Sequence, residues 1–390
     1  MKDLYDRIYR RWSFIPDNCG GRMRKVKSIT IPLLCLIILF SIFLNAYAQT
    51  AEIATFINKG ISYADKQMYD QAISEVNKAI EINPEYAQAY GIRGTIYMKK
   101  GDEDRAISDF SKAIEINPND GTSYSGRACI YYKNKIFYKA ISDFSKAIEI
   151  NPNDDFSYSA RGSSYYGQEL YDEAFSDYNK AIGINPNNDS AFSGRGRVYD
   201  KRGNYDRAIL DFNKAIEINP KDVTSYKSRG EVYYNKQMYD KAIIDLSKAI
   251  EINPYSSILY SERGQAYLMN QNLDHAISDC NKALEIDPKD AKVYANRAMT
   301  YFYKKDYDKS WSDVRRAEGL GMSFQAKFLA DLKEASGGKE PNKIDETVTQ
   351  GDEAGNKTNL LTYGVVIVLV LVIVVCLILV FFSGHNKGAS

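Results

Sequence analysis

Seven of the ten prolines in this 390-residue chain lie 34 residues apart, in one uninterrupted register. They are Pro84, Pro118, Pro152, Pro186, Pro220, Pro254 and Pro288. Each of them closes a near-copy of the segment from Ala72 to Pro84. A fixed period of this length indicates a solenoid, in which each repeat buries its apolar side only against its neighbours.

Each repeat contains two helical patterns. In the third repeat, Tyr124, Ala128 and Tyr131 share one face of a helix with 3.6 residues per turn. The second pattern ends at the proline, because proline cannot supply the next helical hydrogen bond. In seven repeats an aspartate precedes the second apolar stripe, where it can cap free N–H groups and favours the positive end of the helix dipole. These aspartates are Asp70, Asp104, Asp172, Asp206, Asp240, Asp274 and Asp308.

These residues resemble the tetratricopeptide repeat (TPR) family, whose 34-residue unit is a helix–turn–helix with aromatic, small and proline residues at set positions. In the second repeat the matching residues are Tyr90, Gly94, Tyr97, Ala106, Phe110, Ala113 and Pro118. The resemblance covers residues 53–322 in eight repeats, and the last repeat departs from it at Ser310 and Met322. Residues 323–336 are predicted to form an amphipathic capping helix. The resemblance implies an all-α fold, a right-handed superhelical solenoid of eight TPR units with this capping helix at its C-terminal end.

Charge and residue types argue against several functions. The 51 basic and 50 acidic residues give a net charge of +1, whereas a nucleic-acid-binding protein usually carries a basic stripe. His275 and His385 are far apart, and no His, Cys and Asp residues have the spacing of a metal site. No phosphate-binding glycine loop or nucleophile elbow occurs. We therefore expect no enzyme activity, no cofactor and no metal, and no disulfide between Cys129 and Cys280, which lie in distant repeats.

The N-terminal region indicates export. Residues 1–27 form a polar leader with a basic end, and residues 28–48 are apolar and close with small residues. This order is typical of a secretory signal peptide that is cut after Ala48. Its proportions are ordinary when it is read from Met23, which favours a true start there and makes residues 1–22 an extension. The alternative is a long leader with an uncleaved signal anchor.

The C-terminal region indicates a membrane anchor. Residues 337–359 are polar and are expected to form a flexible tether. Residues 360–382 carry no charge and are long enough for a transmembrane helix, and residues 383–390 form a short tail. Basic residues before the first apolar segment should stay in the cytosol. We therefore expect a single-pass membrane protein (two-pass if the signal is uncleaved) whose repeats are extracytoplasmic.

The resemblance also implies where a partner binds. In the family the first helices of the repeats line a concave groove, at positions 2, 5, 9, 12 and 13 counted from residue 53 and every 34 residues thereafter. Position 5 carries mostly small residues and position 12 mostly large ones, so we expect a groove with one small and one aromatic side. Our predicted anchors at position 12 are Met98, Tyr132, Tyr166, Tyr234, Leu268 and Phe302. Tyrosines are good anchors for a peptide or a helix, although a chain with 31 tyrosines can also carry them as decoration.

Charged residues share the groove positions. The set Arg197, Asp200, Lys227 and Glu231 predicts recognition of a mixed-charge peptide, with a self-paired, solvated patch as the alternative. Arginines recur at position 7, on the opposite side of the helix, where we expect their stems to pack and their heads to lie at the edge. They are Arg93, Arg127, Arg161, Arg195, Arg229, Arg263 and Arg297. The Lys and Asn pattern with which one subclass of the family clamps a C-terminal carboxylate does not occur in three consecutive repeats.

The sequence therefore predicts a non-catalytic scaffold or adaptor that holds a protein partner, a peptide or a helix, near a membrane. The alternatives are a cytosol-facing receptor for protein targeting, a structural spacer and a regulatory subunit of an enzyme complex.

Overall fold

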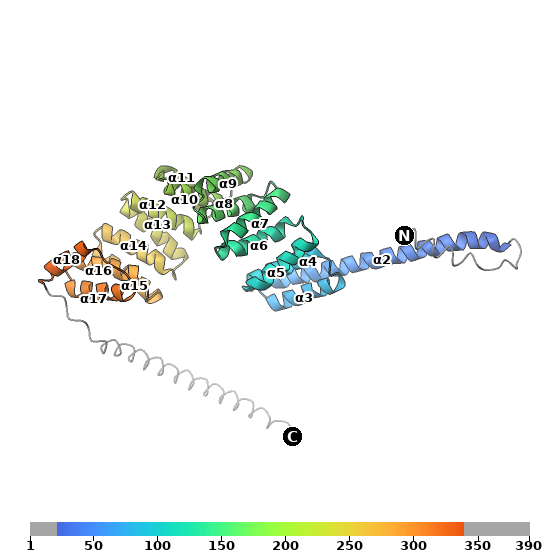
Figure 1. Ribbon diagram of the computed structural model, residues 1–390, viewed down its shortest axis with the longest axis horizontal. Helices are drawn as coiled ribbons and strands as arrows, with labels where there is room; N and C mark the ends of the chain where they lie inside the picture. The colour runs from blue at the N-terminus through green and yellow to red at the C-terminus, as the bar shows by residue number, and fades with distance from the viewer. Residues whose placement is uncertain (1–21, 339–390) are drawn as a thin grey trace, which may run out of the picture. The chain divides into compact units, whose positions relative to one another are not determined.

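The computed structural model describes residues 22–338, and this part of the chain consists of helices and turns, without strands (Figure 1). The helices are α2 (Arg22–Asp65), α3 (Tyr69–Ile82), α4 (Ala87–Lys100), α5 (Glu103–Ile116), α6 (Gly121–Lys133), α7 (Phe137–Ile150), α8 (Asp155–Gly167), α9 (Tyr171–Ile184), α10 (Asp189–Lys201), α11 (Tyr205–Ile218), α12 (Val223–Asn235), α13 (Tyr239–Ile252), α14 (Ser257–Met269), α15 (Leu273–Ile286), α16 (Ala291–Tyr303), α17 (Tyr307–Gly319) and α18 (Ala326–Ala335). The chain divides into an N-terminal unit that ends at Ser225 and a C-terminal unit that begins at Tyr226, and each is described by itself.

The 34-residue period gives an antiparallel helix pair in each repeat, as predicted. In the N-terminal unit α6 packs against α7 of its own repeat, and α7 then packs against α8 of the next repeat. The C-terminal unit repeats this order with α14, α15 and α16. The structure is therefore an all-helical repeat solenoid in which each helix is covered by its nearest neighbours along the chain.

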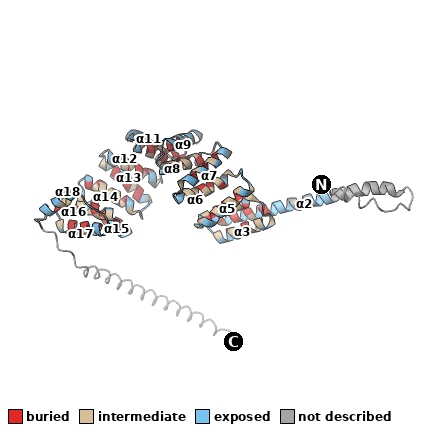
Figure 2. Cartoon of the chain, in the orientation of Figure 1, coloured by how far each residue is buried: buried red, intermediate tan, exposed pale blue. Residues whose placement is uncertain are grey.

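The core lies between the two helices of each repeat (Figure 2). Alanines at position 20, such as Ala106 and Ala140, are fully buried and allow the helices to approach closely. The ring of Phe110 is almost completely buried beneath two glycines. A Cβ atom on Gly94 would lie 3.0 Å from this ring, and one on Gly126 of the next repeat would lie 2.6 Å from it. Glycine at these positions therefore makes room for the large side chain that joins two repeats.

A left-handed residue ends the first helix of every repeat at position 15. Glycine provides this conformation twice, at Gly101 (φ 87°) and Gly203 (φ 70°). The other repeats use the longer residues Gln67, Lys135, Glu169, Gln237, Gln271 and Lys305, with φ between 59° and 64°. Only a few per cent of residues other than glycine adopt positive φ, and the sequence pattern did not reveal this feature.

The aspartates at the start of the second helices have a different role from the predicted cap. Asp70 lies in the first turn of α3, where its charge interacts favourably with the helix dipole. The N-cap residue, however, is Met68, and no side chain caps the helix. The Asp70 carboxylate instead accepts from Lys100 Nζ of the next repeat, at 2.5 Å. Asp240 likewise accepts from Asn270 Nδ2, at 2.8 Å. These carboxylates therefore link successive repeats.

The first helix differs from the predicted boundaries. α2 is continuous from Arg22 to Asp65, so no break separates the apolar segment 28–48 from the first helix of the first repeat. Ile53 and Ile57 of this helix belong to the core of the first repeat, whereas Phe40 is 63% exposed. The sequence analysis placed a domain boundary after Ala48 because the segment ends like a signal peptide, whereas the helix continues across this position.

The C-terminal end of the described chain is closed by a helix, as predicted. α18 begins at Ala326 rather than at residue 323, and its Leu332 is fully buried against Trp311 and Val314 of α17. Among the described residues, no helix combines the length and the apolar character needed to cross a bilayer. The predicted transmembrane helix 360–382 and the tail 383–390 lie outside the described residues, as does nearly all of the predicted tether.

Candidate functional site

The small residues at position 5 do not form one side of an open groove, and that prediction was wrong. Ser125 and Ser193 are 8% and 5% exposed. The Ser125 hydroxyl lies 2.8 Å from that of Ser157, and the Ser193 hydroxyl accepts from Ser225 Oγ at 2.9 Å. Small side chains here allow first helices of neighbouring repeats to pack closely, which buries them.

Each tyrosine at position 12 packs against an aromatic residue at the start of the second helix of its repeat. The pairs are Tyr132–Phe137, Tyr166–Tyr171 and Tyr234–Tyr239, with ring centroids 5.9, 5.4 and 5.5 Å apart. Tyr132 keeps 38% of its surface exposed. The sequence indicates this contact by two aromatic residues five positions apart across the turn, a pattern that the sequence analysis missed.

Three other predicted anchors are less accessible. Leu268 is only 7% exposed and is part of the core. Phe302 packs against Phe328 of α18, with ring centroids 5.6 Å apart, so the capping helix covers it. Met98 is half-buried against the core of its own repeat. The position in the repeat did not reveal what covers these side chains.

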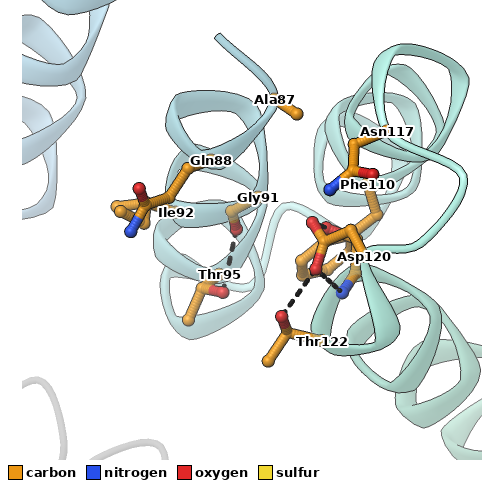
Figure 3. A pocket seen from close by; sticks show the side chains of 10 residues that line it. Ala87, Gln88, Gly91, Ile92, Thr95, Phe110, Asn117, Asp120 and Thr122 are labelled. Atoms are coloured by element: carbon orange, nitrogen blue, oxygen red, sulfur yellow. Dashed lines mark hydrogen bonds between the residues drawn. The ribbon is translucent and has the colours of Figure 1, made fainter. Parts of the chain in front are cut away.

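A polar hollow of about 520 Å³ lies between α4 and α6 (Figure 3). It forms where position 5 holds Gly91 instead of serine, with Thr95 one turn further along α4. On the opposite side Asp120 accepts from Thr122 Oγ1 at 2.6 Å and from the Ser123 backbone N–H at 3.2 Å. Because these bonds fix the polar groups, the hollow has a defined shape.

A second hollow, which we call the Phe156 pocket, has a volume of about 430 Å³ and is formed by α6, α7, α8 and the start of α10. Its wall is largely aromatic: Phe156 is 53% exposed and packs edge-on against Phe144 at 6.4 Å. The complete lining is Cys129, Tyr132, Phe144, Asp155, Phe156, Ser159, Ala160, Ser163, Asn185, Asn187, Asn188, Asp189 and Ser190. Sequence analysis found Tyr132 but missed Phe156, although position 2 is one of the groove positions.

Cys129 lies in this pocket and is partly buried. Burial raises the pKa of its thiol to about 11, so it is protonated at neutral pH. Cys129 and Cys280 are both free cysteines.

Arg197 and Tyr166, two of the predicted groove residues, form a close cation–π contact. The guanidinium carbon lies 4.0 Å from the centroid of the Tyr166 ring. Nearby, the buried Tyr178 donates its hydroxyl to Ser163 Oγ at 3.1 Å, and burial raises its pKa to about 12. Asp200, one of the two acids of the predicted set, is half-buried. The contact therefore places a cation over an aromatic ring.

The predicted charges of the sixth repeat are self-paired, as in the alternative interpretation. Lys227 Nζ donates to Glu231 and, at 3.0 Å, to Glu262 of the next repeat. Sequence analysis missed Glu262. Burial raises the pKa of Glu262 to about 7, Lys227 lowers it and Glu231 raises it. One oxygen of the Glu262 carboxylate is buried without a hydrogen-bond partner.

The heads of the position-7 arginines do not lie at the edge, as had been expected, but are largely buried in ion pairs. Arg161 makes two hydrogen bonds of 2.8 Å to Asp177 of its own repeat and one of 3.0 Å to Ser145 of the preceding repeat. Its guanidinium also lies over the Tyr158 ring at 5.6 Å. The hydrogen bond to Asp177 raises the pKa of Arg161. The same pairing occurs as Arg93–Asp109, Arg127–Asp143, Arg195–Asp211, Arg229–Asp245, Arg263–Asp279 and Arg297–Asp313.

Within the described residues, no cluster of three or more His, Cys, Asp or Glu side chains has the geometry of a metal site. The two hollows are lined by aromatic, hydroxyl, amide and carboxylate groups.

Comparison with known proteins identifies the repeats. Family models described as tetratricopeptide repeat match residues 53–86, 87–120, 122–154, 157–188, 223–256, 257–290 and 280–311, and a model described as TPR repeat matches residues 196–237. No curated protein sequence matches the chain.

Solved structures share the fold. A chain of the APC/C hetero-tetramer Cut9-Hcn1 is 18% identical, with a TM-score of 0.55 over 68% of this chain. This chain spans only 52% of the length of that one. A tetratricopeptide repeat protein from Parabacteroides merdae is 23% identical, with a TM-score of 0.52 over 64% of this chain and 99% of the other. The likenesses show a shared fold, and the repeat matches, which cover more than half of the chain, establish that it belongs to the tetratricopeptide repeat family.

Proposed function

We propose that this protein is a non-catalytic scaffold or adaptor that binds a segment of a partner protein along the first helices of its repeats. The observation that carries the proposal is the pair of hollows on that side of the N-terminal unit, one polar at Gly91 and one aromatic at Phe156. Exposed aromatic side chains in a pre-formed concave site are a common source of binding energy.

The anchors that support the proposal are those that remain accessible. Tyr132 and Phe156 offer exposed rings, and Arg197 on Tyr166 offers a cation in a fixed position. A largely pre-formed surface reduces the ordering cost of binding, so a short extended segment or one helix is a suitable ligand. Tyr234 is the equivalent residue of the C-terminal unit.

We further propose that the scaffold is tethered to a membrane, with its repeats on the extracytoplasmic side. The uncharged segments 28–48 and 360–382 support this, as does the basic residue pattern before the first of them. In the described part of α2, Ile38, Leu39 and Phe40 point in three different directions around the helix and are 49–63% exposed. Apolar side chains exposed on several sides of a helix are suited to lipid rather than to water.

Photo-crosslinking in cells tests the proposal. A benzoylphenylalanine placed at Phe156 should capture a discrete partner protein, and the same probe at Glu149, exposed on the second helix α7, should not. Capture of extracytoplasmic proteins would support both binding and topology, and capture of cytosolic proteins would contradict the topology. A correctly folded protein that gives no adduct from Phe156 would favour the structural spacer.

A further inference from the structure

The rim of the Phe156 pocket carries two carboxylates and no cation. Asp155 and Asp189 begin α8 and α10, and none of the residues that line the pocket is Lys, Arg or His. Only these two repeats have an acid at position 1. The first turn of a helix stabilises a negative charge, so each carboxylate is favourably placed there. Its charge nevertheless faces the rim of the pocket.

The contacts of these carboxylates are neutral. Asp155 Oδ2 accepts from the side-chain amides of Asn185 and Asn188, both at 2.8 Å. Asp189 Oδ2 accepts from the Asn219 amide at 2.8 Å. Neither acid forms an ion pair with any residue in the described part of the chain. Amide donors hold a carboxylate in place without cancelling its charge, so the rim has an uncompensated negative potential.

The wall beneath the rim suits an apolar stem and also a cation. Tyr132 and Phe156 expose ring surface, and Phe144 and Ala160 complete an apolar wall. The faces of aromatic rings attract ammonium and guanidinium groups. Lysine and arginine place a long apolar stem behind a charged head, and thus match a site with rings inside and acids at its edge.

We propose that the Phe156 pocket binds a lysine or arginine side chain of the partner segment, with the stem against the rings and the charged head beside Asp155 and Asp189. This inference rests on the proposed function, because it assumes that a segment lies along the first helices. The inference adds to that function the kind of residue that the partner must place in the pocket, namely a basic one. An acidic side chain would be repelled by the rim, and a purely apolar one would leave the carboxylates without a cation.

Selection from a phage-displayed library of random dodecapeptides against the full-length protein tests this. Bound peptides should share a Lys or Arg at one position. In a labelled peptide, replacing that residue by norleucine should weaken binding about tenfold. In Asp155→Asn/Asp189→Asn the same replacement should change affinity less than twofold, because the interaction it removes is already lost.

The controls separate the two proposals. Glu149→Gln removes an exposed acid outside the pocket and should leave the norleucine effect at about tenfold. If the double variant fails to fold, Asp189→Asn can be used alone, since this side chain has only one amide partner. In this variant the norleucine replacement should keep about half of its effect on affinity, on a logarithmic scale. Two outcomes would overturn this inference and leave the proposed function intact. In the first, the selected peptides require Phe156 for binding but carry no basic residue. In the second, replacing the basic residue by norleucine still weakens binding about tenfold in the Asp→Asn variants. A library that yields no binder would contradict both.

Discussion

The guanidinium of Arg161 and the carboxylate of Asp177 meet through two parallel hydrogen bonds of 2.8 Å, with only 17% and 8% of their side-chain surfaces exposed. The third arginine bond reaches Ser145 in the preceding repeat, so one side chain joins three helices. In a solenoid, where stability is a sum of repeats and their interfaces, such a recurring clamp couples neighbours.

Removal of one partner from this clamp should be costly. We expect Asp177→Asn to lower the free energy of unfolding by about 2 kcal/mol, because Arg161 then keeps its charge in a largely buried position without a carboxylate. Urea unfolding followed by circular dichroism measures this change. Glu149→Gln, which breaks the exposed pair with Lys146, should cost less than about 0.5 kcal/mol. Equal effects of the two changes would show that the clamp is no more than a surface ion pair.

Gly194 should tolerate no side chain. A Cβ atom there would lie 2.3 Å from Cζ of the buried Tyr178, so Gly194→Ala should destabilise the protein by about 1–3 kcal/mol. Gly183→Ala, at a helical glycine with no atom within 4 Å, should instead stabilise it by about 0.5 kcal/mol. Thermal unfolding of the pair gives the comparison. A Gly194→Ala variant as stable as the wild type would mean that Tyr178 can leave this position freely.

Substitutions at the left-handed turn position should change stability in opposite directions, depending on whether glycine is introduced or removed. Lys135 has φ of 59°, so Lys135→Gly should relieve strain and raise stability by about 0.5 kcal/mol. Gly101 has φ of 87°, and Gly101→Ala should lower stability by about 1 kcal/mol. Chemical unfolding of both variants checks this prediction, and a loss of stability in Lys135→Gly would show that the lysine side chain makes a stabilising contribution greater than the strain.

Glu262 should make stability fall as the pH rises. Burial raises its folded pKa to about 7, whereas the unfolded side chain titrates near 4.5, so the folded protein binds the extra proton between these values. Stability should therefore decrease between about pH 4.5 and 7 and stay lower above this window. Each unit of pKa difference corresponds to about 1.4 kcal/mol.

The variant Glu262→Gln should remove this slope and be more stable than the wild type at pH 8. Lys227 and Glu231, which face the same carboxylate, remain unchanged in this comparison. Thermal unfolding across pH 4 to 8 checks the prediction, with the exposed Glu251→Gln as the control. Parallel curves for wild type and Glu262→Gln would contradict it.

Much of the fold could be predicted from local sequence. The Pro register at Pro84 and its successors determined the length of the repeat, and the small residue Ala106 and its equivalents determined which helix faces become core. These features act through backbone geometry and through burial within one helix pair. A repeating sequence pattern is sufficient to specify both.

The candidate site depended on tertiary structure. Periodicity gives the direction in which a side chain leaves its helix, but its exposure depends on how closely the neighbouring helix approaches. Ser125 is buried because two first helices meet there, Phe302 is covered by α18, and Phe156 stays open. The pairing of Arg161 with Asp177, 16 residues away, and the neutral amide contacts of Asp155 likewise arise only when helices pack. The sequence by itself thus determined the repeat and its helices, whereas the packing of adjacent repeats decided which groups remain free to bind, because burial and charge compensation are properties of neighbours in space.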